Sequence, residues 1–447
     1  MGLAYAFLYM GRYNLTVAQN ALGDVITKDD FGQMFAVGAV VYGFSFLING
    51  PLVDRFGGRR GMLIGVFGAL VANLLMGWVL YSQTHLGWTL PVIPMFTLFY
   101  ACNMYFQSFG AVSIVTVKAP WFHVHERGSF STIFGIIISA GIYFAFDWGN
   151  AVVAATRAEP AELGVVASVF AWVFRLGGSG VDENWMIFFI PSIMMALFWC
   201  IMFFWLRNTP GEAGFEDFDT AEASLADDGQ RLPVAVAIKK ILTHPVLLYV
   251  CLIEFCSGVL RNGIMHWYYI FGNELGFAKT FPVTAHWGLA LLVCGIIGAN
   301  ATGWVSDFLF NSRRAPMSAI SYGLMILGVL AMILGLDGNL WIAGIAALTI
   351  STTVIAVHGI LSGTATADFG GSKNTGIAVG IVDGFVYLGT AVQSLAIGKL
   401  VPVGDAAKDP NNWVGWPIFL MPFAIAGFLF TLKIWNALPG RAKKKPA

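Results

Sequence analysis

Long apolar stretches follow one another along nearly the whole chain, and they exclude most folds that form in water. Hydrophobic residues make up 57% of the 447 residues and charged residues only 11%, and the mean hydropathy is +0.73. A water-soluble domain could not cover so much apolar surface. Stretches of about 20 apolar residues are long enough to cross a bilayer as helices. The sequence therefore predicts an all-α membrane protein.

Polar residues divide the apolar runs into twelve predicted transmembrane helices. We place these helices at residues 1–21, 31–53, 60–82, 91–118, 127–153, 184–206, 244–272, 283–310, 315–336, 338–366, 373–401 and 412–437. Residues 154–183 contain an apolar run that is too short and too interrupted to span, and we expect it to form an amphipathic helix in an outer loop.

The longest polar stretch lies between the sixth and the seventh predicted helix. It covers residues 207–243 and is rich in acidic side chains. We interpret it as a solvated cytoplasmic linker between an N-terminal six-helix half, residues 1–206, and a C-terminal half, residues 244–447, that ends in a basic tail. Most of the 25 lysines and arginines then fall on the linker side, which predicts cytoplasmic N- and C-termini and a location in the cell (inner) membrane.

The same short motif follows the second helix of each half. The copies are GPLVDRFGGRR from Gly50 and GWVSDFLFNSRR from Gly303. A glycine permits close approach of two helices, and the aspartate four residues later can hold loop arginines in one conformational state. A basic loop would explain one copy, but two copies at equivalent positions predict a two-fold repeat. The candidate conformational-switch residues are Gly50, Asp54, Arg55, Arg59, Gly303, Asp307 and Arg313.

Two arginines, Arg12 and Arg261, lie within long apolar stretches at equivalent positions of the two halves. Arg12 is about 16 Å from the start of its helix, near the middle of a bilayer core of about 30 Å. A charge at that depth costs at least ~2.5–3.5 kcal/mol and is normally kept in a polar cavity. Arginine stays charged, and its planar fork suits a carboxylate or a phosphate. The pair therefore predicts an anion site between the halves.

Further motifs accompany these arginines in both halves. They are Tyr5 and Tyr9 before Arg12, Asn14, YGFS at Tyr42–Ser45, Tyr105-Phe106-Gln107, WFHVHERG at Trp121–Gly128, NTPGEAGF at Asn208–Phe215, the run Arg261–Trp267, GWVSD at Gly303, His358, and Tyr-Leu-Gly at Tyr387. With these motifs the chain resembles the organophosphate:phosphate antiporters of the major facilitator superfamily, which include the glycerol-3-phosphate and hexose-phosphate transporters. The resemblance covers nearly the whole chain and implies twelve helices in two pseudo-symmetric six-helix halves.

The resemblance also implies a function. The protein would be a secondary active transporter that exchanges a phosphorylated organic anion for inorganic phosphate as its two halves rock about the site. Arg12 and Arg261 would bind the phosphoryl group of either substrate. The other candidate substrate-binding residues are Tyr5, Tyr9, Tyr42, Tyr387, His358 and Gln107. Two fixed positive charges make the empty carrier reluctant to reorient, which favours obligatory exchange.

The chain departs from the family pattern at four positions. Phe46 stands where a lysine is usual, and Ile138 stands where a histidine contributes to the glycerol-3-phosphate site. Tyr13 replaces the lysine after the first arginine, and His266 replaces the aspartate before the tryptophan of the seventh helix. The joint loss of this base and this acid suggests a removed ion pair, with His266 now bonded to Tyr13.

Two acids, Glu254 and Asp383, are additions to the family pattern. Glu254 precedes Arg261 by seven residues on the same helix face, and Asp383 lies one turn before Tyr387. Three readings are open: the acids balance the arginines or pair within the bundle, they contact a cationic or hydroxylated part of the substrate, or they couple transport to protons. Added acids and fewer bases favour a phosphodiester, phosphonate, monophosphate or carboxylate over a bisphosphate.

Two alternative functions stay open beside the antiporter. One is a proton-coupled organic anion symporter that uses Asp383 or Glu254, and the other is a transporter-like membrane sensor of a sugar phosphate. The sequence has no nucleotide-binding loop, nucleophile motif or zinc spacing, so we expect neither enzymatic activity nor a cofactor or metal. With a net charge of zero we expect no nucleic-acid partner. The expected partners are the bilayer, a small organic anion and inorganic phosphate, bound by a monomer.

Overall fold

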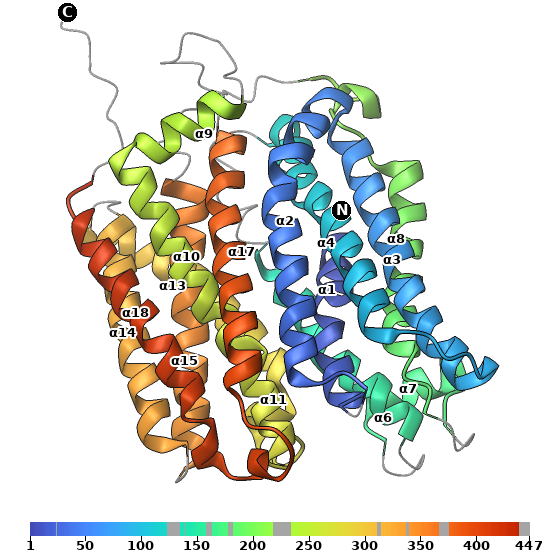
Figure 1. Ribbon diagram of the computed structural model, residues 1–447. Coiled ribbons are helices and arrows are strands. Elements are labelled where there is room, and N and C mark those ends of the chain that lie inside the picture. Colours follow the sequence, from blue (N-terminus) through green and yellow to red (C-terminus); the bar gives the residue numbers. More distant parts are fainter. Residues whose placement is uncertain are drawn as a thin grey trace, which may run out of the picture.

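The computed structural model describes residues 1–23, 25–122, 135–137, 139–157, 163–177, 182–217, 234–310, 314–336, 339–365 and 375–437. Over these ranges the regular elements are helices and none is a strand. Figure 1 shows them in two groups side by side, the blue to green helices α1 to α8 and the yellow-green to red helices α9 to α18. The predicted all-α fold is confirmed.

The N-terminal group is built around long helices, several of which pack against helices that are not their neighbours in sequence. Its elements are α1 (Gly2–Ala21), α2 (Lys28–Phe56), α3 (Gly58–Leu86), α4 (Val92–Lys118), η1 (Ala119–Trp121), η2 (Phe144–Trp148), α6 (Gly149–Arg157), α7 (Val165–Phe174), α8 (Met186–Trp205) and η4 (Gly211–Ala213). Helix α3 packs against α4 and α8, while α1 packs against α8 and η2.

The C-terminal group repeats this arrangement. Its elements are α9 (Val234–Thr243), α10 (Pro245–Met265), α11 (Trp267–Glu274), α12 (Pro282–Ala285), α13 (Trp287–Phe310), α14 (Arg314–Gly335), α15 (Leu340–His358), η5 (Gly359–Ala365), α17 (Thr375–Leu400), η6 (Gly404–Lys408), η7 (Pro410–Trp413) and α18 (Gly415–Lys433). Helix α10 packs against α17 and α18, and α14 packs against α15 and α18. The two groups meet along α2 and α17.

In the part of the chain that the structure describes, each predicted span contains helical structure. Within the described ranges, nine helices have the length and composition to cross a membrane. The other three predicted spans are α1, α4 and α13, of 20, 27 and 24 residues. Side chains such as Phe44, Phe67 and Leu98 are more than half exposed, as expected where lipid rather than water covers a helix.

The outer segment and the linker differ in part from expectation. Helix α7 has ten residues, too few to span, but its predicted amphipathic character is wrong. Val165 and Trp172 on its outer side are more than 80% exposed, while Phe170 is buried, so both sides are apolar. At the end of the predicted linker, α9 is a helix that packs against α10 and α17 because apolar residues such as Ile241, which is buried, recur in it.

Glycines set how closely the helices around the site approach one another. A Cβ atom at Gly258 of α10 would lie 1.9 Å from the carbonyl oxygen of Val386 in α17, and one at Gly389 would lie 2.1 Å from that of Phe255. Only glycine permits this crossing. At Gly50, by contrast, no described atom lies within 4 Å of such a Cβ. Among the described residues, the close approach expected at Gly50 is therefore not found in this conformation.

Candidate functional site

Arg12 lies completely buried where the two halves meet. Its Nε donates a hydrogen bond to Oε1 of Gln107 at 2.8 Å, and its Nη1 donates to the hydroxyl of Tyr387 at 2.6 Å. Gln107 belongs to α4 and Tyr387 to α17, so the guanidinium bridges the halves. Among the described residues its Nη2 has no hydrogen-bond partner. A buried cationic donor without a partner is costly, and this one is available to an anion.

The four predicted tyrosines gather around this guanidinium. Its carbon lies 4.7 Å from the ring centre of Tyr9, 4.4 Å from that of Tyr42 and 5.8 Å from that of Tyr387. The ring centres of Tyr42 and Tyr387 are 4.2 Å apart, and those of Tyr5 and Tyr9 are 5.3 Å apart. Aromatic faces stabilise a desolvated cation, and their hydroxyls supply donors at the site.

Arg261 on α10 approaches the same tyrosines from the other half. The hydroxyls of Tyr13, Tyr9 and Tyr387 interact electrostatically with its guanidinium. Tyr9 and Tyr387 thus lie between the two arginines. We did not predict Tyr13 as a site residue, although it follows Tyr9 by one helical turn and so shares its face.

A chain of buried amides holds Arg12 in place. Nε2 of Gln107 donates to Oδ1 of Asn103 at 3.0 Å, and Nδ2 of Asn73 donates to the same oxygen at 3.2 Å. Asn14 in turn donates to Asn73 at 2.9 Å. Asn103 and Asn73 were not predicted. Polar side chains inside a span are costly unless bonded, so their occurrence in apolar helices was a usable signal.

The two additional acids lie in the C-terminal half. Oε2 of the fully buried Glu254 is 3.1 Å from Nδ1 of His358. The hydroxyl of Ser362 donates to Oδ1 of Asp383. Among these described side chains, neither acid forms an ion pair with Arg12 or Arg261. Of the three readings, direct neutralisation of the arginines by the acids is therefore not found, whereas pairing within the bundle is found for Glu254.

The positions that depart from the family pattern have new surroundings. Phe46 packs edge-on against Tyr42, with ring centres 4.9 Å apart, and forms an apolar wall. Ile138 lies outside the described residues. The predicted hydrogen bond from His266 to Tyr13 is wrong: Nδ1 of His266 is 2.7 Å from the hydroxyl of Thr16, while Tyr13 offers its ring at 5.4 Å. Thr16 lies one turn beyond Tyr13 and is level with His266.

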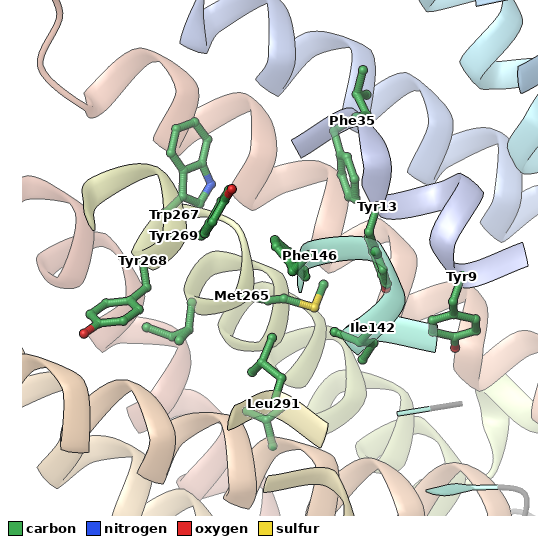
Figure 2. Packing of buried hydrophobic residues seen from close by; sticks show 14 of the residues in the cluster. Tyr9, Tyr13, Phe35, Ile142, Phe146, Met265, Trp267, Tyr268, Tyr269 and Leu291 are labelled. Carbon is green, nitrogen blue, oxygen red and sulfur yellow. The ribbon is translucent and has the colours of Figure 1, made fainter. Parts of the chain in front are cut away.

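Aromatic side chains of both halves pack around that contact. Figure 2 shows Phe146 and Met265 between Tyr13 on one side and Trp267 with Tyr269 on the other. Phe35 lies 4.4 Å from the ring centre of His266, and Phe146 lies 5.2 Å from that of Tyr269. This dense packing excludes a passage between the halves at this level.

Lys28 joins the halves at the end of the bundle away from α9. It is the first residue of α2, placed there by a capping box between Thr27 and Asp30. Its Nζ lies 2.8 Å from Oε1 of Glu274 and donates to the carbonyl oxygen of Pro402 at 2.8 Å. The side chain is only 5% exposed. A buried ion pair with a second hydrogen bond makes this end of the protein closed.

The repeated loop motifs lie at the opposite end, near α9 (Figure 1). Gly50, Asp54 and Arg55 belong to the last turns of α2, Arg59 to the first turn of α3, and Gly303 with Asp307 to α13, while Arg313 lies outside the described residues. The Arg59 guanidinium donates to the carbonyl oxygen of Phe203 at 2.7 Å, and its backbone N–H donates to Asn208 at 2.8 Å.

Asn208 links that loop to the chain that leaves the N-terminal half. Its backbone N–H donates to the carboxylate of Glu212 at 2.8 Å, and the indole of Trp121 donates to its carbonyl oxygen at 3.1 Å. The hydrogen bonds from the backbone N–H and from the side-chain amide of Asn208 lower the pKa of Glu212. The NTPGEAGF motif is therefore a turn that holds the α2–α3 loop, which its sequence did not indicate.

Comparison with known proteins agrees with this architecture. The sequence profile of the Major Facilitator Superfamily matches residues 1–394. The glycerol-3-phosphate transporter of Bacillus subtilis (strain 168) is 25% identical over 443 residues, which cover 97% of this chain and 90% of that protein. The membrane sensor protein UhpC of Escherichia coli (strain K12) is 27% identical over 457 residues, covering 97% and 90%. These relatives confirm the resemblance to the organophosphate:phosphate antiporter branch.

A solved structure confirms the fold. It is a bacterial homologue of the human lysosomal transporter Spinster in an inward-facing and unoccupied conformation, with a TM-score of 0.72, 13% identity and coverage of 99% of this chain and 97% of that one. The chain therefore belongs to the Major Facilitator Superfamily: it is a multi-pass membrane protein of a transporter family and not an enzyme.

Proposed function

We propose that this protein exchanges a phosphorylated organic anion for inorganic phosphate across the cell (inner) membrane, with Arg12 and Arg261 binding the phosphoryl group. The observation that carries the proposal is the buried guanidinium of Arg12, which touches both halves and keeps Nη2 without a partner among the described residues. The similarity to a glycerol-3-phosphate transporter supports the substrate class.

The site chemistry favours exchange over one-way transport. Two guanidiniums match the two negative charges of a phosphate monoester or of inorganic phosphate. When the site is empty, the positive charges of Arg12 and Arg261 lie in a largely apolar interior without an anion to neutralise them. The empty carrier therefore reorients slowly. We assign the two moving halves to residues 1–206 and 244–447, joined by the linker 207–243. The loops from Gly50 to Arg59 and from Gly303 to Arg313 exchange their contacts as the halves move.

The orientation follows from the same proposal. With α9, both repeated loop motifs and the two termini on the cytoplasmic side, the end closed by Lys28 faces outward, and the site communicates with the cytoplasm in this conformation. A monomer suffices for this cycle because both arginines come from one chain. Alternating access then requires the contacts of Lys28 to break each time the outer end opens.

Counterflow in vesicles tests the proposed function. Protein reconstituted into vesicles that are loaded with phosphate should take up labelled phosphate and glycerol 3-phosphate, and uptake should stop when internal phosphate is omitted, because the empty carrier does not return. Net uptake into phosphate-free vesicles, with or without a proton gradient, would overturn obligatory exchange. Gradient-driven uptake that is lost in Asp383→Asn would establish the symporter instead.

A sensor is the second candidate, because the chain is as similar to UhpC as to the transporter. A sensor would bind phosphate or its ester at the same arginines, but it would turn over slowly. Substrate-induced thermal stabilisation of the purified protein without counterflow in the same vesicles would favour this alternative.

Weakening the outer closure is expected to expose the interface between the halves. Lys28→Gln removes the ion pair to Glu274, and we expect a Thr16→Cys reporter to react several-fold faster with an impermeant maleimide from the outside. Lys408→Gln is the matched control, because Lys408 also pairs with an acid at 2.7 Å but is 72% exposed, where such pairs contribute little. Equal reactivity of the reporter in both variants would show that Lys28 does not hold this end closed.

A further inference from the structure

Four polar side chains form a second group beside the arginines, within the C-terminal half. Glu254 pairs with His358 at 3.1 Å, and Ser362 donates to Asp383. The charges of Glu254 and His358 both act on the carboxylate of Asp383, so the two pairs belong to one cluster. Oε1 of Glu254 is buried and has no hydrogen-bond partner among the described residues. A carboxylate oxygen left in this state costs free energy unless a donor reaches it.

The cluster lies on the α9 side of the arginines along α10 and α17. Helices α10 and α17 both run from the α9 end toward the closed end (Figure 1). Glu254 precedes Arg261 by seven residues and Asp383 precedes Tyr387 by four, which are rises of about 10 Å and about 6 Å toward the α9 end. The charge of Arg261 acts on both His358 and Asp383. The cluster therefore adjoins Arg261, and a ligand held by Arg261 can extend toward it.

Charge matching defines what the ligand must carry. The two guanidiniums already match a dianionic phosphoryl group. When both are ionised, Glu254 and Asp383 add two further negative charges, and a proton on His358 would offset only one of them. At least one negative charge is then left without a counterion among the described side chains of the cluster, and a buried charge without a counterion is costly.

We propose that Glu254, Asp383 and His358 bind the ammonium group of the substrate, which makes the organic anion a short aminoalkyl phosphate. An ammonium group has three donors. It can satisfy Oε1 of Glu254 and the carboxylate of Asp383 together, and it supplies the missing positive charge. The proposal rests on the proposed function, because the phosphoryl end is placed by Arg12 and Arg261.

The test compares two ligands of nearly equal size. Phosphoethanolamine and n-propyl phosphate differ in whether an ammonium or a methyl group ends the chain. We expect phosphoethanolamine to inhibit phosphate:phosphate exchange at a concentration at least about tenfold lower, a difference of about 1.4 kcal/mol in binding. In Glu254→Gln and Asp383→Asn the ratio of the two inhibitory concentrations should fall toward one.

Glu183→Gln is the matched control. Glu183 also pairs with a histidine, His85, at 2.8 Å, but on the N-terminal half away from the site, so this variant should keep the wild-type ratio. Thermal stabilisation of the purified proteins by each ligand is a second measurement, and it reports binding even where a variant transports poorly.

The outcomes separate this proposal from the transport mechanism. Equal potency of the two ligands on the wild-type protein, or a stronger effect of glycerol 3-phosphate than of phosphoethanolamine, would overturn the ammonium subsite while phosphate exchange still stands. An unchanged ratio in both acid variants would overturn the role of Glu254 and Asp383. Absence of phosphate exchange would refute the antiporter, and thermal stabilisation would still decide whether an ammonium group is recognised.

Discussion

Arg12→Lys is expected to lower phosphate exchange by at least about 100-fold. Lysine keeps the charge but presents a single nitrogen, which cannot reach Gln107, Tyr387 and an anion as Nε, Nη1 and Nη2 of Arg12 can. Hydrogen bonds to charged groups contribute about 1.5–3 kcal/mol each, and about 1.4 kcal/mol corresponds to a factor of ten. The loss of two such bonds accounts for the expected size.

Initial rates of labelled phosphate counterflow measure this effect. Arg261→Lys should show a loss of the same order, since Arg261 faces the same tyrosines. The control is Arg207→Lys. Among the described residues the Arg207 side chain donates to the carbonyl oxygens of Phe204 and Leu206 at the helix end, so this variant should exchange phosphate normally. Wild-type rates in both site variants would mean that charge alone suffices, and the fork would have no role.

Gly258→Ala is expected to destabilise the C-terminal half and to abolish most transport. The added methyl group would lie 1.9 Å from the carbonyl oxygen of Val386, and backbone cannot move aside as a flexible side chain can. Overpacking typically costs about 1–3 kcal/mol, and separation of α10 from α17 would also move Arg261 away from Tyr387. We expect a lower melting temperature and a strongly reduced exchange rate in the same preparation.

Gly415→Ala provides the comparison for that substitution. Gly415 is the first residue of α18, and no described atom lies within 4 Å of a Cβ added there, so stability and exchange should stay near wild type. If Gly258→Ala kept both its melting temperature and its activity, the close crossing of α10 and α17 would not be required for the site.

The helices and the arginine pair were predictable because they depend on local chemistry. Apolar runs of about 20 residues must form helices in lipid, since their backbone groups have no other partner there. A charge such as that of Arg12 marks a polar site by its cost alone. Tyr9 and Tyr42 followed from their place in motifs around the arginines, and they lie against the guanidinium.

The mistaken predictions concern contacts between distant segments. His266 was expected to bond Tyr13, but a difference of one helical turn places Thr16 opposite it, and helical register across an interface is not encoded locally. The close approach expected at Gly50 depends on how a second helix packs against α2, and no described atom lies within 4 Å of a Cβ added there. The segment 154–183 was expected to form an amphipathic helix, but in α7 the exposed Val165 and Trp172 and the buried Phe170 make both sides apolar.

The amino-acid sequence by itself determined that the chain crosses a membrane and repeats in two halves, and it predicted an anion site with two arginines between them. These conclusions follow from solvation cost and periodicity, which act within single helices. Only the tertiary structure decided that Glu254 pairs with His358 rather than with an arginine, that an amide chain holds Arg12, and that Lys28 closes one end. Those outcomes depend on which side chains of separate helices reach one another, and helix packing alone sets those distances.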